Sequence, residues 1–375
     1  MMYTILFSVA LSFLVTILAI PTIIQVAREK KLFDEPDERK IHTIGIPTLG
    51  GLGVFAGFIL SLLLMTSNSN RELQYFVAAT ITIFFLGIKD DILTISPAKK
   101  LIGQFIAAFI LIHFGGLQIT NLNGFMGVFE IPLFISIPFT FTTIVFIINS
   151  FNLIDGVDGL VGSIGIVTSL FFGGYFLLAG QTFYSILGFA LAGSLLAFLI
   201  FNFSPAKIFM GDTGSLLIGI VNSVMAIKFI TVAGNKSSAL PLASAPALAM
   251  AILIIPIFDT LRVFIMRILN KRSPFSPDRT HIHHFLLDLG YSHSRVTITC
   301  VLTNIGFITI SFFLQIVGTT LLISILMTVA LSLMILVKYK RKRLLTPTTE
   351  KLLNNESSRP SYSSLLLALK IVEIN

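Results

Sequence analysis

The chain has 375 residues, of which 55% are hydrophobic and 12% are charged, and its formal net charge is +8. Soluble domains average about 25% charged residues, so this composition excludes a soluble globular protein. The 35 phenylalanines exclude intrinsic disorder, and the single cysteine, Cys300, excludes a disulfide scaffold. The mean hydropathy of +0.92 therefore indicates a membrane protein that crosses the bilayer several times.

Apolar stretches long enough to cross a bilayer as helices, about 20 residues each, recur along the chain. The sequence predicts an all-α polytopic protein with eleven of them: 3–26, 49–66, 73–88, 101–119, 131–148, 159–179, 184–202, 213–233, 240–268, 294–315 and 317–337. The first stretch resembles a signal sequence. It is long, however, and no small-residue cleavage site follows it, so we expect it to remain as a helix.

The distribution of Lys and Arg predicts the orientation of these helices. Alternate loops, the residues that flank them and the C-terminal tail carry 23 of the 26 Lys and Arg residues. By the positive-inside rule these segments face the cytosol, which places the N-terminus outside and the C-terminus inside. Topology and the anionic lipid bilayer then account for the net charge, so no nucleic-acid partner is expected. We expect a membrane domain over 1–340 and a mobile cytosolic tail over 341–375.

One outer loop, 117–130, has a pattern of its own. Short stretches of β type flank Asn123-Gly124, a dipeptide typical of hairpin turns. The sequence therefore predicts a small β-hairpin on the outer face.

Acidic and amide side chains gather at the cytosolic ends of the apolar stretches. Each alone has an ordinary structural interpretation: Asp212 resembles a helix cap, and Asp259 with Arg262 resembles a structural ion pair. As a set they repel one another, and few basic residues lie beside the NSFNLIDGVDG segment, so a divalent cation or a clamp of cationic groups is required. Oxygen donors favour Mg²⁺, or Mn²⁺ in its place, over zinc. The set comprises Asp90, Asp91, Asn149, Asn152, Asp155, Asp158, Asp212 and Asp259.

The segment NSFNLIDGVDGL places polar residues at every third position from 149 to 158. On a straight helix these positions would turn through half a circle, so the segment must bend for them to serve one site. Gly156 and Gly159 permit that bend. We expect Asn152 and Asp155 to lie near the metal and Asp158 to reach another part of the ligand.

Cationic side chains lie on neighbouring cytosolic loops. The spacing of the histidines in the loop 269–293 fits a zinc site poorly, whereas histidines beside an arginine suit a pyrophosphate. Lys100 follows the paired aspartates, and its neighbour Lys99 is interpreted as an ordinary positive-inside anchor. Carboxylates, a divalent metal and surrounding cations together are typical of phosphoryl transfer. The other cationic candidates are Lys40, His42, Arg279, His281, His283 and His284.

Five stretches, in this order, carry a resemblance to a known family: DEPDERKIH with PTLGG, KDD, NSFNLIDGVDGL, NFSPAKIFMGDTGSL and SPDRTHIHH. They resemble the polyprenyl-phosphate N-acetylhexosamine-1-phosphate transferases, the superfamily that also contains the MurNAc-pentapeptide translocase. The resemblance implies a Mg²⁺-dependent enzyme of the bacterial cytoplasmic membrane with a cytosolic active site. Its substrates would be a UDP-sugar, most simply UDP-GlcNAc, and undecaprenyl phosphate, and its reaction would begin a cell-envelope polysaccharide.

The resemblance also implies roles for single residues. Asn152 and Asp212 would hold Mg²⁺ with Asp155 close by, and Asp90 or Asp91 would be the base or nucleophile. Phe209 would stack on uracil, Asp158 would contact the nucleoside, and Lys100 would contact phosphate. Ile282, within the His-Ile-His-His segment, argues against a MurNAc-pentapeptide substrate, because that branch carries three consecutive histidines.

Several alternatives stay open at this level. Direct attack of the lipid phosphate and a two-step route through a carboxylate nucleophile fit the residues equally. Another UDP-N-acetylhexosamine or UDP-MurNAc-pentapeptide could replace UDP-GlcNAc as the donor, and a homodimer is compatible with the family. An ion-coupled transporter is disfavoured, because its acids would lie at the bilayer midplane and within repeats. The bend expected at Pro256 could open a lateral groove for the prenyl chain or could be a packing kink.

Overall fold

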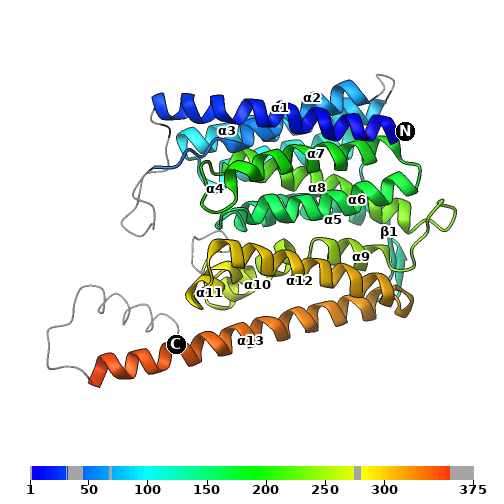
Figure 1. Cartoon of the computed structure of the whole chain (residues 1–375). Coiled ribbons are helices and arrows are strands. Elements are labelled where there is room, and N and C mark those ends of the chain that lie inside the picture. The colour runs from blue at the N-terminus through cyan, green and yellow to red at the C-terminus, as the bar shows by residue number, and fades with distance from the viewer. Residues whose placement is uncertain (1, 31, 33–44, 67–69, 274–279, 355–375) are drawn as a thin grey trace.

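The computed structural model describes the chain except for residues 1, 31, 33–44, 67–69, 274–279 and 355–375. The described part is almost entirely helical (Figure 1). Its elements are α1 Met2–Glu29, α2 Gly50–Met65, α3 Arg71–Leu93, α4 Pro97–Phe109, the π-helix η1 Ile110–Phe114, β1 Asn121–Phe125, β2 Val128–Glu130, α5 Leu133–Leu153, α6 Leu160–Leu178, α7 Thr182–Asn202, α8 Gly211–Ala233, α9 Ala245–Ile252, α10 Ile254–Leu269, α11 Ile282–Asp288, α12 His293–Leu314, the 3₁₀-helix η2 Gln315–Val317 and α13 Thr319–Asn354.

Every one of the eleven predicted stretches coincides with a helix or a helix pair, so the prediction of an all-α polytopic protein is confirmed. Eight helices of the described chain are long and apolar enough to cross a membrane, and the bent pair α9 and α10 makes a ninth. α2 is a shorter apolar helix. The count of eleven membrane spans and their orientation stay predictions.

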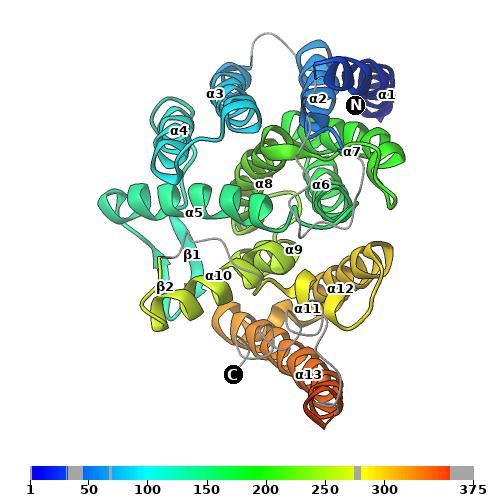
Figure 2. The same ribbon diagram turned by 90° about the vertical axis from the view of Figure 1, so that its left-hand side faces the viewer.

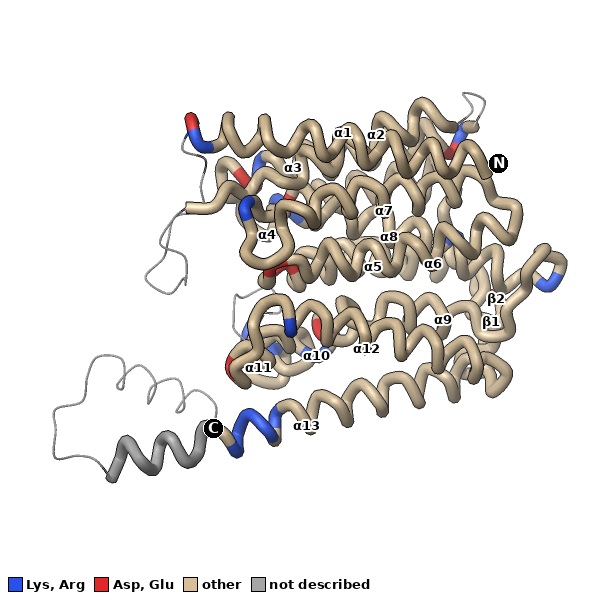
Figure 3. Tube along the Cα trace, viewed as in Figure 1, with Lys and Arg blue, Asp and Glu red and all other residues tan. Residues whose placement is uncertain are grey.

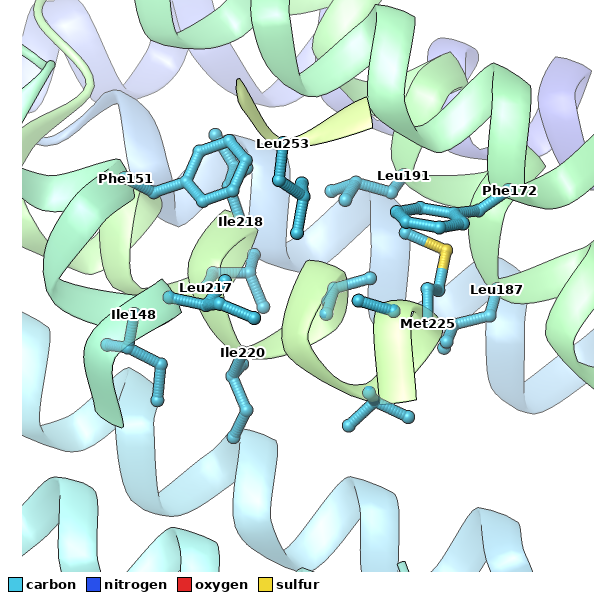
Figure 4. Packing of buried hydrophobic residues seen from close by; sticks show 14 of the residues in the cluster. Ile148, Phe151, Phe172, Leu187, Leu191, Leu217, Ile218, Ile220, Met225 and Leu253 are labelled. Atoms are coloured by element: carbon cyan, nitrogen blue, oxygen red, sulfur yellow. The ribbon is translucent and has the colours of Figure 1, made fainter. Parts of the chain in front are cut away.

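The long helices run side by side (Figure 1), and the view along them shows α8 surrounded by its neighbours (Figure 2). α8 packs against α2, α3, α5, α6, α7 and α9. Its Leu217, Ile218 and Met225 are buried among apolar side chains of the surrounding helices, such as Phe151 and Phe172 (Figure 4). An apolar helix buried on all sides fixes the direction in which its first turn faces, and Asp212 lies in that turn.

The predicted bend of the ninth stretch lies at Leu253, where α9 and α10 meet at 85°. Pro256 is the third residue of α10. A proline has no backbone N–H to donate to the preceding turn, which costs nothing in the first turn of a new helix. Pro256 therefore starts α10 in a new direction, and the expected bend is confirmed.

The predicted hairpin is confirmed, with β1 antiparallel to β2, but its turn lies further along the chain than expected. Phe125 pairs with Val128, so the two turn residues are Met126 and Gly127, with φ of +50° and +80°. Two positive φ values are typical of a type I′ turn. The predicted Asn123-Gly124 turn is wrong: the pair lies within β1, where the register is irregular.

Most of the charged residues lie toward one end of the bundle (Figure 3). We call this the charged end, where α3 and α5 end and α4 and α8 begin. α1 starts at the opposite end, whereas α13 runs toward the charged end (Figure 1). The predicted domain boundary at 340 falls inside α13, and Arg341 donates to Asp288 of α11 at 2.7 Å. Lys228, within α8, pairs with Glu72 at 2.8 Å.

Candidate active site

Four of the predicted site residues meet at the charged end, around the ammonium group of Lys100. Lys100 Nζ lies 3.0 Å from Asp90 Oδ2 and donates to Asn152 Oδ1 at 3.1 Å and to Asp212 Oδ2. The four side chains come from the first turns of α4 and α8 and the last turns of α3 and α5. Sequence positions up to 122 residues apart thus supply one cluster, which we call the lysine cluster: Asp90, Lys100, Asn152 and Asp212.

Asn152 also fixes the orientation of Asp212. Its Nδ2 donates to Asp212 Oδ1 at 2.7 Å and to Ser215 Oγ at 2.9 Å. Ser215 was not predicted as a site residue, although it follows Asp212 by one helical turn. Asn149 was grouped with the acids but does not join the cluster, because it exchanges two hydrogen bonds with Gln104.

The second aspartate of the pair, Asp91, caps α8. Its Oδ1 accepts the Asp212 backbone N–H at 2.7 Å, and its Oδ2 accepts the Thr213 N–H at 3.0 Å and the Thr213 hydroxyl at 2.5 Å. These N–H groups belong to the first turn of α8, where the helix itself offers them no acceptor. Interpreting Asp212 as the cap of this helix was therefore wrong, because Asp91, from 121 residues earlier, has that role.

Close backbone contacts bring α2, α3 and α8 together beside the lysine cluster. Gly50 N–H donates to Phe209 O and Gly51 N–H to Met210 O, each at 2.9 Å. A Cβ on Gly51 would lie 2.2 Å from Gly214 N, and a Cβ on Gly211, whose φ is +70°, would lie 2.1 Å from Thr48 O. The glycines of PTLGG and FMGD are thus required because backbones approach each other at this point.

The segment after α5 bends as predicted. α5 ends at Leu153, Gly159 adopts a φ of +76°, and α6 begins at Leu160. Asp155 lies in this bend. Burial, followed by the negative charges of Asp212, Asp91 and Asp158, raises the pKa of Asp155 well above its usual range. A carboxyl group among three others favours a proton or a bound cation.

Asp158 lies on the same bend but is directed into the protein. It is 4% exposed, its Oδ1 lies 3.2 Å from His293 Nδ1, and its Oδ2 accepts the Ala206 N–H at 3.3 Å. These contacts tie the bend to α12 and to the loop before α8. Contact with a nucleoside stays a prediction for Asp158. His293, the first residue of α12 and 135 positions from Asp158, was not among the predicted site residues.

The histidine segment lies beside the bend. His283 is 1% exposed, and a Cβ on Gly156 would lie 2.6 Å from its Nε2. Burial, followed by the charge of His284, lowers the pKa of His283 to about 3, so its ring is neutral. His281 is held by Asp259. The predicted ion pair of Asp259 with Arg262 is confirmed at 2.7 Å.

Some predicted residues lie outside the described part of the chain, and one lies at the edge of the site. Lys40, His42 and Arg279 fall in segments that the structure does not describe. Phe209 is half-buried in the segment that pairs with α2. Stacking of Phe209 on uracil and phosphate contacts of the three cationic residues stay predictions.

The lysine cluster supplies carboxylate and amide oxygens, which are the donors that a hard divalent cation prefers. In the described residues, no three His, Cys, Asp or Glu side chains are arranged to hold a metal ion. Mg²⁺ commonly takes one or two protein oxygens and completes its shell with water and substrate phosphates. The Asn152 and Asp212 oxygens already surround the Lys100 ammonium group, so this place accepts positive charge.

The fold and the cluster define a multi-pass membrane protein with a charged site assembled from several helix ends. The model of the family described as glycosyl transferase family 4 matches residues 73–230, which include the whole lysine cluster. The Bacillus subtilis protein named "Probable undecaprenyl-phosphate N-acetylglucosaminyl 1-phosphate transferase" is 32% identical, covering 80% of this chain and 82% of that protein.

Two further relatives agree. The Escherichia coli K12 "Undecaprenyl-phosphate alpha-N-acetylglucosaminyl 1-phosphate transferase" is 31% identical, covering 74% of this chain and 75% of the relative. The Mycobacterium tuberculosis H37Rv "Decaprenyl-phosphate N-acetylglucosaminephosphotransferase" is 33% identical, covering 70% of each chain. The chain belongs to glycosyl transferase family 4, and the resemblance noted from its motifs is confirmed.

Proposed function

We propose that this protein transfers N-acetylglucosamine-1-phosphate from UDP-GlcNAc to undecaprenyl phosphate at the cytosolic face of a bacterial membrane and releases UMP. The lysine cluster carries the proposal, because it sets an ammonium group among carboxylate and amide oxygens at the charged end of a membrane bundle. Such a site can hold a phosphorylated nucleotide beside a phosphate that is anchored in the lipid. The names of the relatives support the same reaction.

The proposed site includes Mg²⁺, which Asn152 and Asp212 would hold with Asp155 nearby. When bound, the metal would neutralise phosphate oxygens of the nucleotide diphosphate. The negative charges of Asp212, Asp91 and Asp158 around the buried Asp155 support a cation here, because positive charge would offset their mutual repulsion. Lys100 would then shift toward the phosphate oxygens and bind them as a point charge.

The proposed reaction is a direct displacement at phosphorus. An oxygen of the lipid phosphate forms a bond to the phosphorus that carries the sugar, and the bond from that phosphorus to the bridging oxygen breaks. UMP leaves with the electron pair. A phosphate monoester has a second pKa of about 6, so much of the lipid phosphate is already dianionic at pH 7 and needs no strong base.

The two aspartates of the pair have different surroundings, and this supports the direct route. Both oxygens of Asp91 accept hydrogen bonds from the first turn of α8, so Asp91 positions Asp212. Asp90 Oδ1 accepts the Ile95 N–H at 2.8 Å, and its Oδ2 faces Lys100. Asp90 therefore anchors the ammonium group. A phospho-aspartate trapped on Asp90 or Asp91 would overturn this route in favour of two steps.

The sugar is the least constrained part of the proposal. The His-Ile-His-His segment favours an N-acetylhexosamine over MurNAc-pentapeptide, and the relatives named above are all N-acetylglucosamine enzymes by name. A panel of UDP-sugars offered to the purified protein would show which one is used. If the protein used only UDP-N-acetylgalactosamine, the proposed reaction type would stand and the proposed sugar donor would be wrong.

The decisive assay measures UMP release by the purified protein in detergent. We expect release only when UDP-GlcNAc, undecaprenyl phosphate and Mg²⁺ are all present, and loss of release after chelation with EDTA. Asp212→Asn should lose at least about a hundredfold in rate. Asp288→Asn, which removes a carboxylate paired with Arg341 outside the lysine cluster, is the matched control. No UMP release from any UDP-sugar with the lipid present would refute the proposed function.

A further inference from the structure

Asp259 is a buried carboxylate that the lysine cluster does not include. It lies in α10, after the bend at Leu253, and is 1% exposed. Its Oδ1 accepts Arg262 Nη2 at 2.7 Å and the Ile282 N–H at 3.0 Å, and its Oδ2 lies 2.8 Å from His281 Nδ1. One carboxylate thus joins the bent helix to the start of the histidine segment.

Arg262 makes further contacts with the residues around the start of α11. In addition to Asp259, its Nη2 donates to the Thr280 carbonyl oxygen, and its guanidinium lies 5.5 Å from the centre of the Phe285 ring. Arg341 of α13 lies 4.5 Å from the same ring. Arg262 of α10 and Arg341 of α13 therefore both hold the first residues of α11 in place. An ion pair that only stabilised α10 would not need the contacts of Arg262 with Thr280 and Phe285.

The contact with Asp259 also decides which nitrogen of His281 carries a proton. An ionised carboxylate can only accept, so Nδ1 must donate, and Nε2 is the ring nitrogen that Asp259 does not contact. The ring of His281 stacks on that of His283, with centroids 5.6 Å apart and planes 5° apart. His283 in turn lies against Gly156, next to Asp155.

His283 supplies an independent sign of a ligand. It is 1% exposed, and within the described residues neither of its ring nitrogens has a hydrogen-bond partner. A buried imidazole without a partner is costly unless something fills that place. In the proposed reaction, the group that could supply such a partner is the diphosphate of the nucleotide sugar.

We propose that Asp259 is a positioning residue that holds His281 with Nδ1 toward α10, so that His281 and the stacked His283 present their nitrogens to the diphosphate of the UDP-sugar. The inference rests on the proposed function and adds to it a contact from outside the lysine cluster. Because Nδ1 already donates to Asp259, His281 donates to a phosphate oxygen only as the imidazolium, with a second proton on Nε2, and the negative charge of Asp259 stabilises that cation.

Asp259→Asn tests the positioning role while it keeps an acceptor for Arg262 and the Ile282 N–H. The amide oxygen can still accept from Arg262 and the Ile282 N–H, but its Nδ2 can only donate. His281 Nδ1 must then accept, so the ring keeps one proton, on Nε2, and loses the positive charge that would attract the diphosphate. We expect the KM for UDP-GlcNAc to rise about tenfold while the KM for undecaprenyl phosphate changes less than twofold. Asp288→Asn on the neighbouring helix α11 should change neither.

A double-mutant cycle separates positioning from general stability. In a His281→Ala background, Asp259→Asn should have less than a twofold further effect, because its action passes through His281. If the two changes instead multiply, or if both KM values rise together, Asp259 has only a structural role and the inference is wrong.

Hydrogen exchange provides a readout that needs no turnover, so its result is separate from that of the proposed function. Asp259→Ala removes the acceptor of the Ile282 N–H, and exchange in the peptide 280–288 should become at least tenfold faster. Asp259→Asn keeps that acceptor and should leave exchange unchanged. If exchange is equal in the wild type and in Asp259→Ala, Asp259 does not hold the start of α11, and this conclusion is independent of the substrate.

Discussion

Replacing Asp91 is the change whose outcome most clearly distinguishes a positioning role from a chemical one. Asp91→Ala removes three hydrogen bonds, from the N–H groups of Asp212 and Thr213 and from the Thr213 hydroxyl. Loss of a helix cap costs about 0.5–2 kcal/mol, and hydrogen bonds to charged groups contribute about 1.5–3 kcal/mol each. Because these bonds share one group they do not add fully, and we expect a loss of about 2–4 kcal/mol.

The same change should displace the carboxylate of Asp212, which lies in the first turn that Asp91 caps. A shift of about 1 Å in such a group costs about a hundredfold in rate. We therefore expect Asp91→Ala to lower both the unfolding temperature in detergent and the rate of UMP release. Asn70→Ala is the matched control, since Asn70 caps α3 at its other end by accepting the Glu72 N–H at 2.9 Å. It should cost about 1 kcal/mol and leave activity intact.

Asp91→Asn refines the test. The amide keeps one acceptor but directs its NH₂ group at the N–H groups of α8, so this variant should also be less stable than the wild type. If Asp91 were instead the base or nucleophile, the variant would fold normally and be inactive. Wild-type stability of Asp91→Asn together with lost activity would refute the positioning role.

Three further changes probe the site and its surroundings. Lys100→Met removes the ammonium group of the lysine cluster and should lower kcat/KM about a hundredfold or more in the UMP assay, whereas the exposed Lys99→Met should stay within twofold. Equal effects of the two changes would contradict the cluster. Asp155→Asn removes a negative charge beside Asn152 and should raise the Mg²⁺ concentration that gives half the maximal rate about tenfold. If that concentration is unchanged, Asp155 does not lie near the metal. Gly211→Ala should destabilise by about 1–3 kcal/mol or more in thermal unfolding, because φ is +70° and the Cβ would meet a carbonyl oxygen. Gly180→Ala, at a φ of +73° with open space around it, should cost less, and equal costs would contradict the close packing.

Sequence patterns predicted the helices well, because apolar runs of membrane length need no information from distant residues. They also predicted that residues around 90, 152 and 212 belong together, since each lies where an apolar stretch ends on the same side. The bend at Gly156 and Gly159 followed from helical geometry alone. All of these depend on local spacing.

What the sequence could not predict is which distant partner each polar group takes. Asp91 caps a helix that begins 120 residues later, and Asp158 meets His293 through packing of α12 against the bend. Asp259 was recognised as the partner of Arg262, one turn away, but not as that of His281. These pairs depend on how the helices pack, and helix periodicity carries no information about it.

The hairpin shows the same limit on a smaller scale. Asn123-Gly124 and Met126-Gly127 both adopt the positive φ values that a tight turn requires. Pairing of Phe125 with Val128 places the turn at the second site. The carbonyl of Asn123 accepts the Thr319 hydroxyl at 2.6 Å, so contact with α13 holds the first pair within the strand.

The central claim is that the lysine cluster is the place where a divalent cation and a nucleotide meet. An experimental structure of the protein with UMP and Mn²⁺, located by anomalous scattering, tests it most directly. We expect one manganese ion within ligand distance of the Asn152 and Asp212 oxygens, with the nucleotide phosphate beside Lys100. Manganese and nucleotide bound away from these residues, or at the opposite end of the bundle, would contradict the assignment of the site.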